Sequence, residues 1–257
     1  MDFEKLLALG CRSNYRIGIG LSREKFIATE RQIKAIGCSL RLTRYSTPQS
    51  LVLALRDGVI DAGVRGTMSS SKILNELRKS FNVDRIMRAA LMESALGKPF
   101  ILAPVGIDEG RDYASRLELA GRTVDYFSAA HWRLSVGVLS KGRAEDSDRG
   151  TAIRRSLEEG ERLARALKSR GIRVKHFSIL IEDAVSESDL VIAPDGVSGN
   201  LIFRTLHFVG GGRAIGAPVV NLPKVFVDTS RVKTEYSDAI RLASGLAKVR
   251  ERTHSNT

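Results

Sequence analysis

What the chain has little of is the first guide to its class. Only two of its 257 residues are cysteines, Cys11 and Cys38, and two cysteines do not suggest a disulfide framework. No apolar run approaches the roughly 20 residues that a membrane-spanning helix needs. The opening letters MDFE do not begin a signal peptide. We therefore expect a cytoplasmic protein without a membrane partner.

The signatures of several enzyme classes are also absent. The sequence has no CxxC pair and no Cys/His cluster, so it predicts no metal site. It has no GxSxG, no GxxxxGK followed by Ser or Thr, and no GxGxxG at a strand-to-helix turn. These absences argue against a serine hydrolase, a P-loop NTPase and the commonest dinucleotide or S-adenosylmethionine folds.

The net charge of +12 is the unusual feature of the composition. A basic protein of this kind can bind nucleic acid. Its lysines and arginines are nevertheless spread along the chain among acidic residues, and aromatic side chains make up only 6%. There is no basic tract interleaved with aromatics and no helix-turn-helix pattern. We favour a solvated basic surface with sites for small anions, and nucleic-acid binding is the lesser alternative.

Short apolar runs alternate along the chain with longer helical patterns. The run YRIGIGL at 15–21 predicts a strand, and Ser22 is placed to cap a helix that ends at Gly37. A long amphipathic helix closes at Gly171, and another helical pattern fills 237–252. Repeated β-α units with nearly continuous apolar strands predict a parallel sheet covered on both faces.

Four predicted strand ends are rich in small polar residues, and open α/β sheets bind ligands at such carboxyl ends. They are VRGTMSSS at 64–71, VLSKGRAEDSD at 138–148, DGVSGN at 195–200 and VFVDTSR at 225–231. The first and third stand at predicted helix N-termini, where backbone N–H groups favour an anion. A plain capping turn is the alternative there. The second is basic, and a solvated loop is its alternative.

In their order along the chain these loops resemble the phosphate acetyltransferase and butyryltransferase superfamily. The matching segments are DAGVRGTMSSSKIL, VGVLSKGRAEDSD, SDLVIAPDGVSGNLIFRT with GGGRAIGAPVVN behind it, and VFVDTSR followed by Ser237-Asp238. DGVSGNLIFRT is closer still to PlsX, the acyl-phosphate-forming enzyme of phospholipid synthesis. Within the superfamily the chain most resembles the methanogen marker protein 4 (MtxX) group, through its short length, its segment PVGIDEGRDYA and its basic, archaeal-looking composition.

The resemblance implies a two-lobed α/β/α fold with mostly parallel sheets, like that of isocitrate and isopropylmalate dehydrogenases. It implies a discontinuous first lobe of residues 1–80 plus 217–257, a second lobe of residues 81–216, and a ligand cleft between them. It also implies a homodimer, a small anionic substrate, and coenzyme A or another phosphorylated coenzyme as ligand. Loops of both lobes would then converge on one site.

The resemblance also implies roles for particular residues. Ser230 and Arg231 match the family's Ser-Arg pair, in which Ser hydrogen-bonds the tetrahedral oxyanion and Arg holds phosphate or neutralises developing charge. Asp238 matches the carboxylate that takes a proton from the coenzyme A thiol, with Glu235 as its rival. Candidates for phosphate or substrate binding are Arg65, Gly66, Ser69, Ser70, Ser71, Lys141, Ser198, Gly199 and Asn200.

Three departures from the family pattern matter. Arg65 replaces a small serine and adds a cation to the expected site, and no Gly follows Ser230-Arg231. The segment APVGIDEG, with Asp108 and Glu109, replaces the family's ADCAVNPNP. Anion binding remains the expectation, and two activities stay open. One is acyl transfer between a coenzyme A thioester and phosphate, and the other is a methanogenesis-associated methyl transfer, or binding alone, on the same fold.

Overall fold

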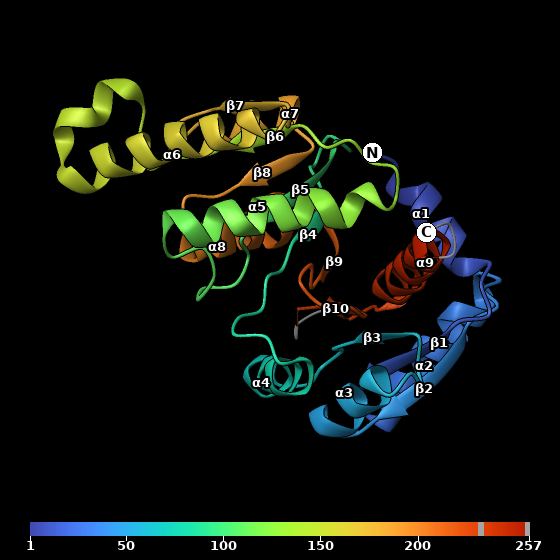
Figure 1. Ribbon diagram of the computed structural model, residues 1–257. Coiled ribbons are helices and arrows are strands. Elements are labelled where there is room, and N and C mark those ends of the chain that lie inside the picture. Colours follow the sequence, from blue (N-terminus) through green and yellow to red (C-terminus); the bar gives the residue numbers. More distant parts are fainter. Residues whose placement is uncertain (231–233, 255–257) are drawn as a thin grey trace. The chain divides into compact units, whose positions relative to one another are not determined.

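The structure is a computed structural model that describes residues 1–230 and 234–254 (Figure 1). The chain divides into two compact units. Unit 1 consists of Met87–Ala214 together with Met1, and unit 2 consists of Asp2–Ile86 and the chain from Ile215 onward. Each unit is built on a mostly parallel sheet with helices packed against it, so the predicted α/β class is confirmed.

The described part of unit 2 contains strands in the order β2-β1-β3-β10-β9, where β9 belongs to unit 2 from Ile215 onward. Their bounds are Arg16–Gly20 for β1, Arg41–Tyr45 for β2, Ala62–Val64 for β3, Arg213–Pro218 for β9 and Val225–Asp228 for β10. The first four strands in this order pair in parallel, and β9 pairs antiparallel to β10. Ile19 pairs with Val64 and Val64 with Val227, so β1, β3 and β10 end at the same edge.

The helices of unit 2 begin with side-chain caps in three cases. Asp2, Ser22 and Thr47 accept hydrogen bonds from the first turns of α1, α2 and α3. The bounds are α1 Phe3–Cys11, α2 Arg23–Ala35, α3 Pro48–Arg56, α4 Ser70–Phe81 and α9 Ser237–His254. Helices α3 and α4 and strand β10 share a buried cluster that includes Leu51, Leu55, Ile73, Leu77 and Phe226.

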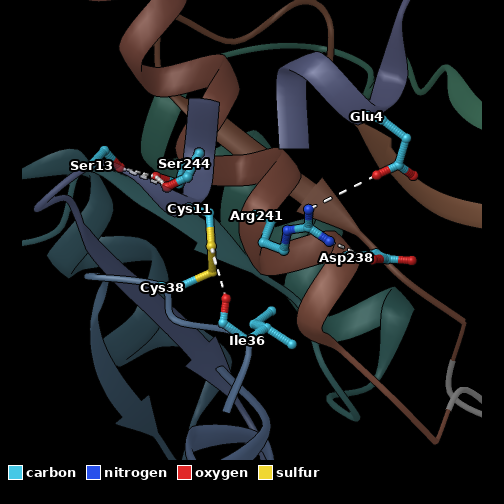
Figure 2. The surroundings of a disulfide bond; sticks show 9 residues. Glu4, Cys11, Ser13, Ile36, Cys38, Asp238, Arg241 and Ser244 are labelled. Carbon is cyan, nitrogen blue, oxygen red and sulfur yellow. Dashed lines mark hydrogen bonds and ion pairs between the residues drawn. A yellow bond between two sulfur atoms is a disulfide. The ribbon is translucent and has the colours of Figure 1, made fainter. Parts of the chain in front are cut away.

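Helices α1 and α9 pack closely against each other. A Cβ atom at Gly10 would overlap the carbonyl oxygen of Arg241, so only glycine permits this approach. Ser13 Oγ hydrogen-bonds Ser244 Oγ at the same contact (Figure 2). We did not predict α1 from the sequence. A helix of 9 residues is marginal by itself, and packing against α9 decides its formation.

Cys11 and Cys38 form a disulfide (Figure 2). Cys11 is the last residue of α1, Cys38 follows α2, and their Cα atoms are 4.4 Å apart. We did not predict this bond, because two cysteines did not suggest a disulfide framework. A disulfide requires proximity in the fold, which a sequence separation of 27 does not reveal.

The described part of unit 1 contains strands in the order β4-β5-β8-β6-β7. Their bounds are Ala90–Glu93 for β4, Pro99–Ala103 for β5, Val136–Val138 for β6, Val174–His176 for β7 and Leu190–Ile192 for β8. β4 is antiparallel to β5, and the other pairs are parallel. Every residue of β8 and of β6 is buried, which is why both read as continuous apolar runs.

The helices of unit 1 connect these strands. They are α5 Tyr113–Ser128, the 3₁₀ helix η1 Ala144–Arg149, α6 Thr151–Ser169, α7 Ile181–Glu187 and α8 Gly196–Phe208. The sequence did not predict the short α7 or strand β9, because neither has a long periodic pattern. None of the described helices is long and apolar enough to cross a membrane.

Candidate functional site

The ends of β3 and β10 bring Arg65 and Asp228 together in unit 2. Val64 pairs with Val227, so the residues that follow them lie side by side. Arg65 Nε donates to the Asp228 carboxylate, and Arg65 Nη1 donates to Met68 O at 3.0 Å. Both charged side chains are buried. The cation that we predicted to meet a ligand is therefore already paired within the protein.

The turn after β3 is fixed by its neighbours. Thr229 Oγ1 donates to Gly66 O at 3.0 Å, and Thr67 N donates to Gly20 O at 2.9 Å. Gly66 has a φ of +63°, and a Cβ atom there would overlap Gly20 O. Glycine is required at this position on both counts. The backbone conformation and the close approach of Gly20 therefore explain why residue 66 is a glycine, without any ligand.

The N-terminus of α4 follows this turn and differs from those of α1, α2 and α3. Ser69 stands at the capping position but makes no side-chain bond to the first turn. Its Oγ instead lies 3.1 Å from Ser71 Oγ. Ser69 and Ser70 are half-buried and Ser71 is exposed. The first-turn N–H groups of α4 therefore lack the side-chain acceptor that the other three helices have.

The remaining predicted residues of unit 2 lie after β10. Ser230 is half-buried directly beyond the strand, and Arg231 lies outside the described residues. Asp238 stands in the first turn of α9 with its carboxylate 3.4 Å from Arg241 Nη1 (Figure 2). Its rival Glu235 is exposed.

Tyr236 is a buried residue of this region that sequence reasoning missed. Its side chain is fully covered, and burial raises the pKa of its hydroxyl, with the charge of Arg65 acting in the opposite direction. No motif pointed to it, because an isolated tyrosine has no sequence signature.

In unit 1 the segment DGVSGN forms the start of α8. Asp195 accepts a hydrogen bond from Ser198 N at 2.7 Å, which caps the helix, and its other oxygen lies 2.7 Å from Lys141 Nζ. Burial would raise the pKa of Asp195, but the Lys141 and Ser198 hydrogen bonds outweigh burial and hold that pKa below its usual value. Lys141 therefore joins the loop after β6 to the cap of α8.

The other residues of this segment hold the loop 104–109. A Cβ atom at Gly199 would overlap Pro104 O, and one at Gly196 would overlap Gly106 O. Asn200 Nδ2 donates to Val105 O at 2.8 Å. The predicted ligand residues Gly199 and Asn200 thus contact this loop within unit 1, and close backbone packing accounts for both glycines.

The loop 104–109 itself carries a buried ion pair. Glu109 Oε1 accepts from Arg88 Nε at 2.6 Å, and Glu109 Oε2 accepts from Gly106 N at 3.2 Å. Burial raises the pKa of Glu109, and the charge and hydrogen bond of Arg88 oppose this. Asp108 is exposed, and its carboxylate lies 3.8 Å from Arg88 Nη2. Asp108 and Glu109 belong to the segment that differs from the family pattern, but nothing in the sequence predicted their contacts with Arg88.

A second network in unit 1 joins Ser140, His176 and Glu161. Ser140 Oγ lies 2.7 Å from His176 Nε2, and His176 Nδ1 lies 2.8 Å from Glu161 Oε1, beside a groove of about 560 Å³. The order of contacts is that of a Ser-His-acid triad. Ser140 Oγ also donates to Ser156 O at 2.9 Å, and the serine is buried. The network is therefore structural, since no substrate can approach the hydroxyl.

The predicted site residues thus fall in two groups. Those in unit 2 are Arg65, Gly66, Ser69, Ser70, Ser71, Ser230 and Asp238. Those in unit 1 are Lys141, Ser198, Gly199 and Asn200. Among the described residues, no group of three or more His, Cys, Asp or Glu side chains is arranged to hold a metal ion.

Sequence similarity to known proteins shows the family of this chain. No protein-family model matches it. "Putative methyltransferase mtx subunit X" of Methanosarcina mazei is 42% identical over 230 residues, which cover 89% of this chain and 82% of that protein. The chain belongs to the Mtx subunit X family. An "uncharacterized methyltransferase" of Methanopyrus kandleri, 38% identical over 258 residues, covers 90% of the chain and 99% of its own length. The resemblance to the MtxX group is confirmed.

Solved structures show the fold of this chain. A branched-chain phosphotransacylase from Enterococcus faecalis has a TM-score of 0.68 at 15% identity and covers 92% of this chain and 99% of its own. A phosphotransacetylase from Streptococcus pyogenes has a TM-score of 0.67 at 15% identity, and the match covers 98% of this chain and 100% of that one. A 4-hydroxythreonine-4-phosphate dehydrogenase from Klebsiella pneumoniae has a TM-score of 0.56 at 10% identity, and the match covers 95% of this chain and 86% of that one. The phosphotransacetylase-like fold is confirmed, and two enzyme classes share it.

Proposed function

We propose that the chain is a phosphate acyltransferase-like enzyme whose anion site lies at the ends of β3 and β10 and the N-terminus of α4. The observation that carries the proposal is the first turn of α4, which receives no bond from Ser69 and directly follows the fixed turn at Gly66. Such a first turn is a ready site for a phosphate oxygen. The phosphotransacylase-like fold supports the same reaction class.

In the proposed reaction a phosphate oxygen attacks the carbonyl carbon of an acyl thioester of coenzyme A. A C–O bond forms while the carbonyl oxygen takes up negative charge, and the C–S bond then breaks. The proton of the attacking phosphate ends on the thiolate sulfur. Ser230 donates to the oxyanion, Arg231 balances the phosphate charge, and Asp238 takes the thiol proton in the reverse direction.

The pairing of Arg65 with Asp228 gives Arg65 a positioning role in this proposal. Its charge is matched by the carboxylate, and its Nη1 atom holds Met68 O just before α4. Arg65 thereby fixes where the first turn of α4 begins. Ser70 and Ser71 are then held where their N–H groups and hydroxyls can meet an anion.

Phosphate-dependent release of thiol from a series of acyl-coenzyme A thioesters tests the proposal. Arg231→Ala and Ser230→Ala should each lower kcat/KM by about 100-fold or more. Arg56→Ala is the matched control, because Arg56 is an exposed arginine of unit 2 that contacts its neighbour Asp57. Equal rates for the unaltered chain and Arg231→Ala would contradict the assignment.

A methyl transfer, or binding of a phosphorylated coenzyme without turnover, is the second candidate. The name of the family relatives and the buried Arg88–Glu109 pair in the segment that departs from the acetyltransferases favour it. Mass spectrometry of small anions released from the purified chain separates the candidates. A co-purified phosphorylated coenzyme together with no thiol release would favour the second.

We also propose that the protein acts in the cytoplasm as a homodimer.

A further inference from the structure

The positive charge of the chain is divided unevenly between its two units. Unit 2 holds 22 of the 41 Lys and Arg residues but 12 of the 29 Asp and Glu residues, so it carries +10 of the net charge of +12. The anion site proposed above uses Arg231 and the already paired Arg65. It therefore leaves most of this charge unexplained.

Much of the charge is gathered at one edge of the unit 2 sheet. Arg16 pairs with Arg41 in the register of β1 and β2, and Ile17 and Val225 both pair with Ala62, so these strands begin at the same edge. Five segments meet at that edge: 11–16, 31–41, 56–61, 221–224 and 248–252. They contain ten Lys or Arg residues against three Asp or Glu residues. We call this surface the basic edge. Cations that are spread along the sequence are thus brought together by the fold.

Contacts between the segments make the basic edge one surface. Arg41 N donates to Tyr15 O at 3.1 Å, which joins the first two segments. The Tyr15 hydroxyl donates to the Glu251 carboxylate, and Arg250 Nη1 donates to Leu222 O at 3.2 Å. The end of α9 is thereby tied both to the start of β1 and to the segment that precedes β10. A surface held in this way presents its cations in fixed positions.

Arg16 and Arg41 show that the cations are not all matched within the protein. They are register partners at the start of neighbouring parallel strands, and both are exposed. Asp61 binds Arg16 at 2.7 Å. Arg41 forms no ion pair with any described residue, and the same holds for the exposed Arg12 and Arg31. Like charges directly opposite each other in a sheet lower its stability. An anion bound from outside would remove that repulsion.

Helix dipoles account for only part of the basic edge. Lys34 and Arg56 stand in the last turns of α2 and α3, where a cation offsets the negative end of the helix dipole. Arg16 and Arg41 open strands and have no such role. The excess of cations is therefore larger than the helix ends require.

We propose that the basic edge binds the phosphate backbone of a nucleic acid without reading its sequence. The edge spans the starts of β2, β1, β3 and β10, which at the usual strand spacing is about 14 Å. A duplex carries about eight negative charges over that length of its axis, whereas a small anion would match only a few of the ten cations. Seven of the ten are arginines, whose planar guanidinium group donates two parallel hydrogen bonds to phosphate oxygens.

An anionic membrane surface fits the basic edge less well. Binding to a membrane gains from apolar side chains that enter the lipid. In the described structure the five segments expose two large apolar side chains, Ile36 and Val59, and these belong to different segments. The edge therefore offers charge without an apolar face, which favours a nucleic acid.

Fluorescence anisotropy of a short labelled duplex of random sequence, prepared as DNA and as RNA, tests this proposal and shows which of the two is preferred. The unaltered chain should bind with an affinity that falls steeply as salt is added. Arg31→Glu with Arg41→Glu should raise Kd at least about 10-fold and lower the slope of log K against log salt by about two. Arg31→Lys with Arg41→Lys keeps both charges and should retain most of the affinity.

The matched control is Arg133→Glu with Arg165→Glu. Both are exposed arginines of unit 1 that form no ion pair in the described part of the chain. The control changes the net charge by the same amount and leaves the basic edge intact, so its Kd should stay close to that of the parent chain. Circular dichroism checks that all variants remain folded.

Three results would overturn the proposal. They are a parent chain that binds neither duplex, an equal loss of affinity in the control and the basic-edge variant, and binding to phosphatidylserine vesicles in place of the duplexes. Nucleic-acid binding lies beyond the proposed acyl transfer, because the basic edge is at the opposite end of β3 and β10 from the candidate anion site. Thiol release is scored separately, so either proposal can fail without the other.

Discussion

Arg65 and Asp228 form a buried ion pair that joins the ends of the adjacent parallel strands β3 and β10. Nε of Arg65 donates to the carboxylate, and Asp228 also accepts from Thr229 N at 2.9 Å. The pair binds the two strand ends on which the candidate anion site is built. Its removal therefore affects both the stability of unit 2 and the position of α4.

Asp228→Asn should destabilise the chain by about 3 to 5 kcal/mol, because it leaves a buried guanidinium without its counter-charge. Urea denaturation followed by circular dichroism measures the loss. Arg65→Met with Asp228→Leu removes both charges and should recover most of the stability. An Asp228→Asn chain as stable as its parent would show that the pair is solvated in solution.

Gly199→Ala should destabilise unit 1 by about 1 to 3 kcal/mol, because the new methyl group would overlap Pro104 O and displace loop 104–109. Gly210→Ala is the control, since a Cβ atom there would come no closer than 3.3 Å to Leu206 O, its nearest neighbour. Thermal unfolding of the two variants side by side is the measurement. Equal melting temperatures would mean that the loop moves without cost.

The Lys141–Asp195 pair should make stability depend on pH. The folded pKa of Asp195 is depressed, so the pair contributes above the unfolded pKa of about 4, and the contribution is lost as pH falls through the folded pKa. Asp195→Asn keeps a good N-cap. It should therefore cost only about 0.5 to 1 kcal/mol at pH 7 for this partly exposed pair.

The difference between the Asp195→Asn chain and its parent should shrink as pH falls below about 4. Denaturant midpoints at neutral and acidic pH measure it. Asp183→Asn, at an exposed position of α7, is the control and should show no such closing gap. A difference that stays constant down to low pH would place the origin of the effect outside the ion pair.

Reduction of the Cys11–Cys38 disulfide should lower the free energy of unfolding by about 3.5 kcal/mol, from the loop-closure entropy of a sequence separation of 27. Cys11→Ser with Cys38→Ser should match the reduced chain. Thiol alkylation followed by mass measurement shows how many cysteines are free before reduction. Two free thiols in the untreated protein would exclude the bond under those conditions.

Much of the fold was readable from the sequence because it depends on local patterns. The apolar run at 15–21 gave β1, and the pattern at 237–252 gave most of α9. Helix α1 was not readable, since its 9 residues form a helix only against α9. The disulfide was missed for the same reason, as it depends on where α1 ends in space.

The candidate site divides in the same way. Sequence patterns located the polar strand ends and the helix starts, because caps, glycines and apolar runs are local signals. Only the tertiary structure showed that Arg65 is paired with Asp228 and that Asn200 holds the carbonyl of Val105. Those contacts join residues 163 and 95 positions apart. The sequence by itself thus determined which segments form strands, helices and polar turns. Whether a polar side chain in a turn is open to a ligand or already bonded was decided by the long-range packing of parallel strands.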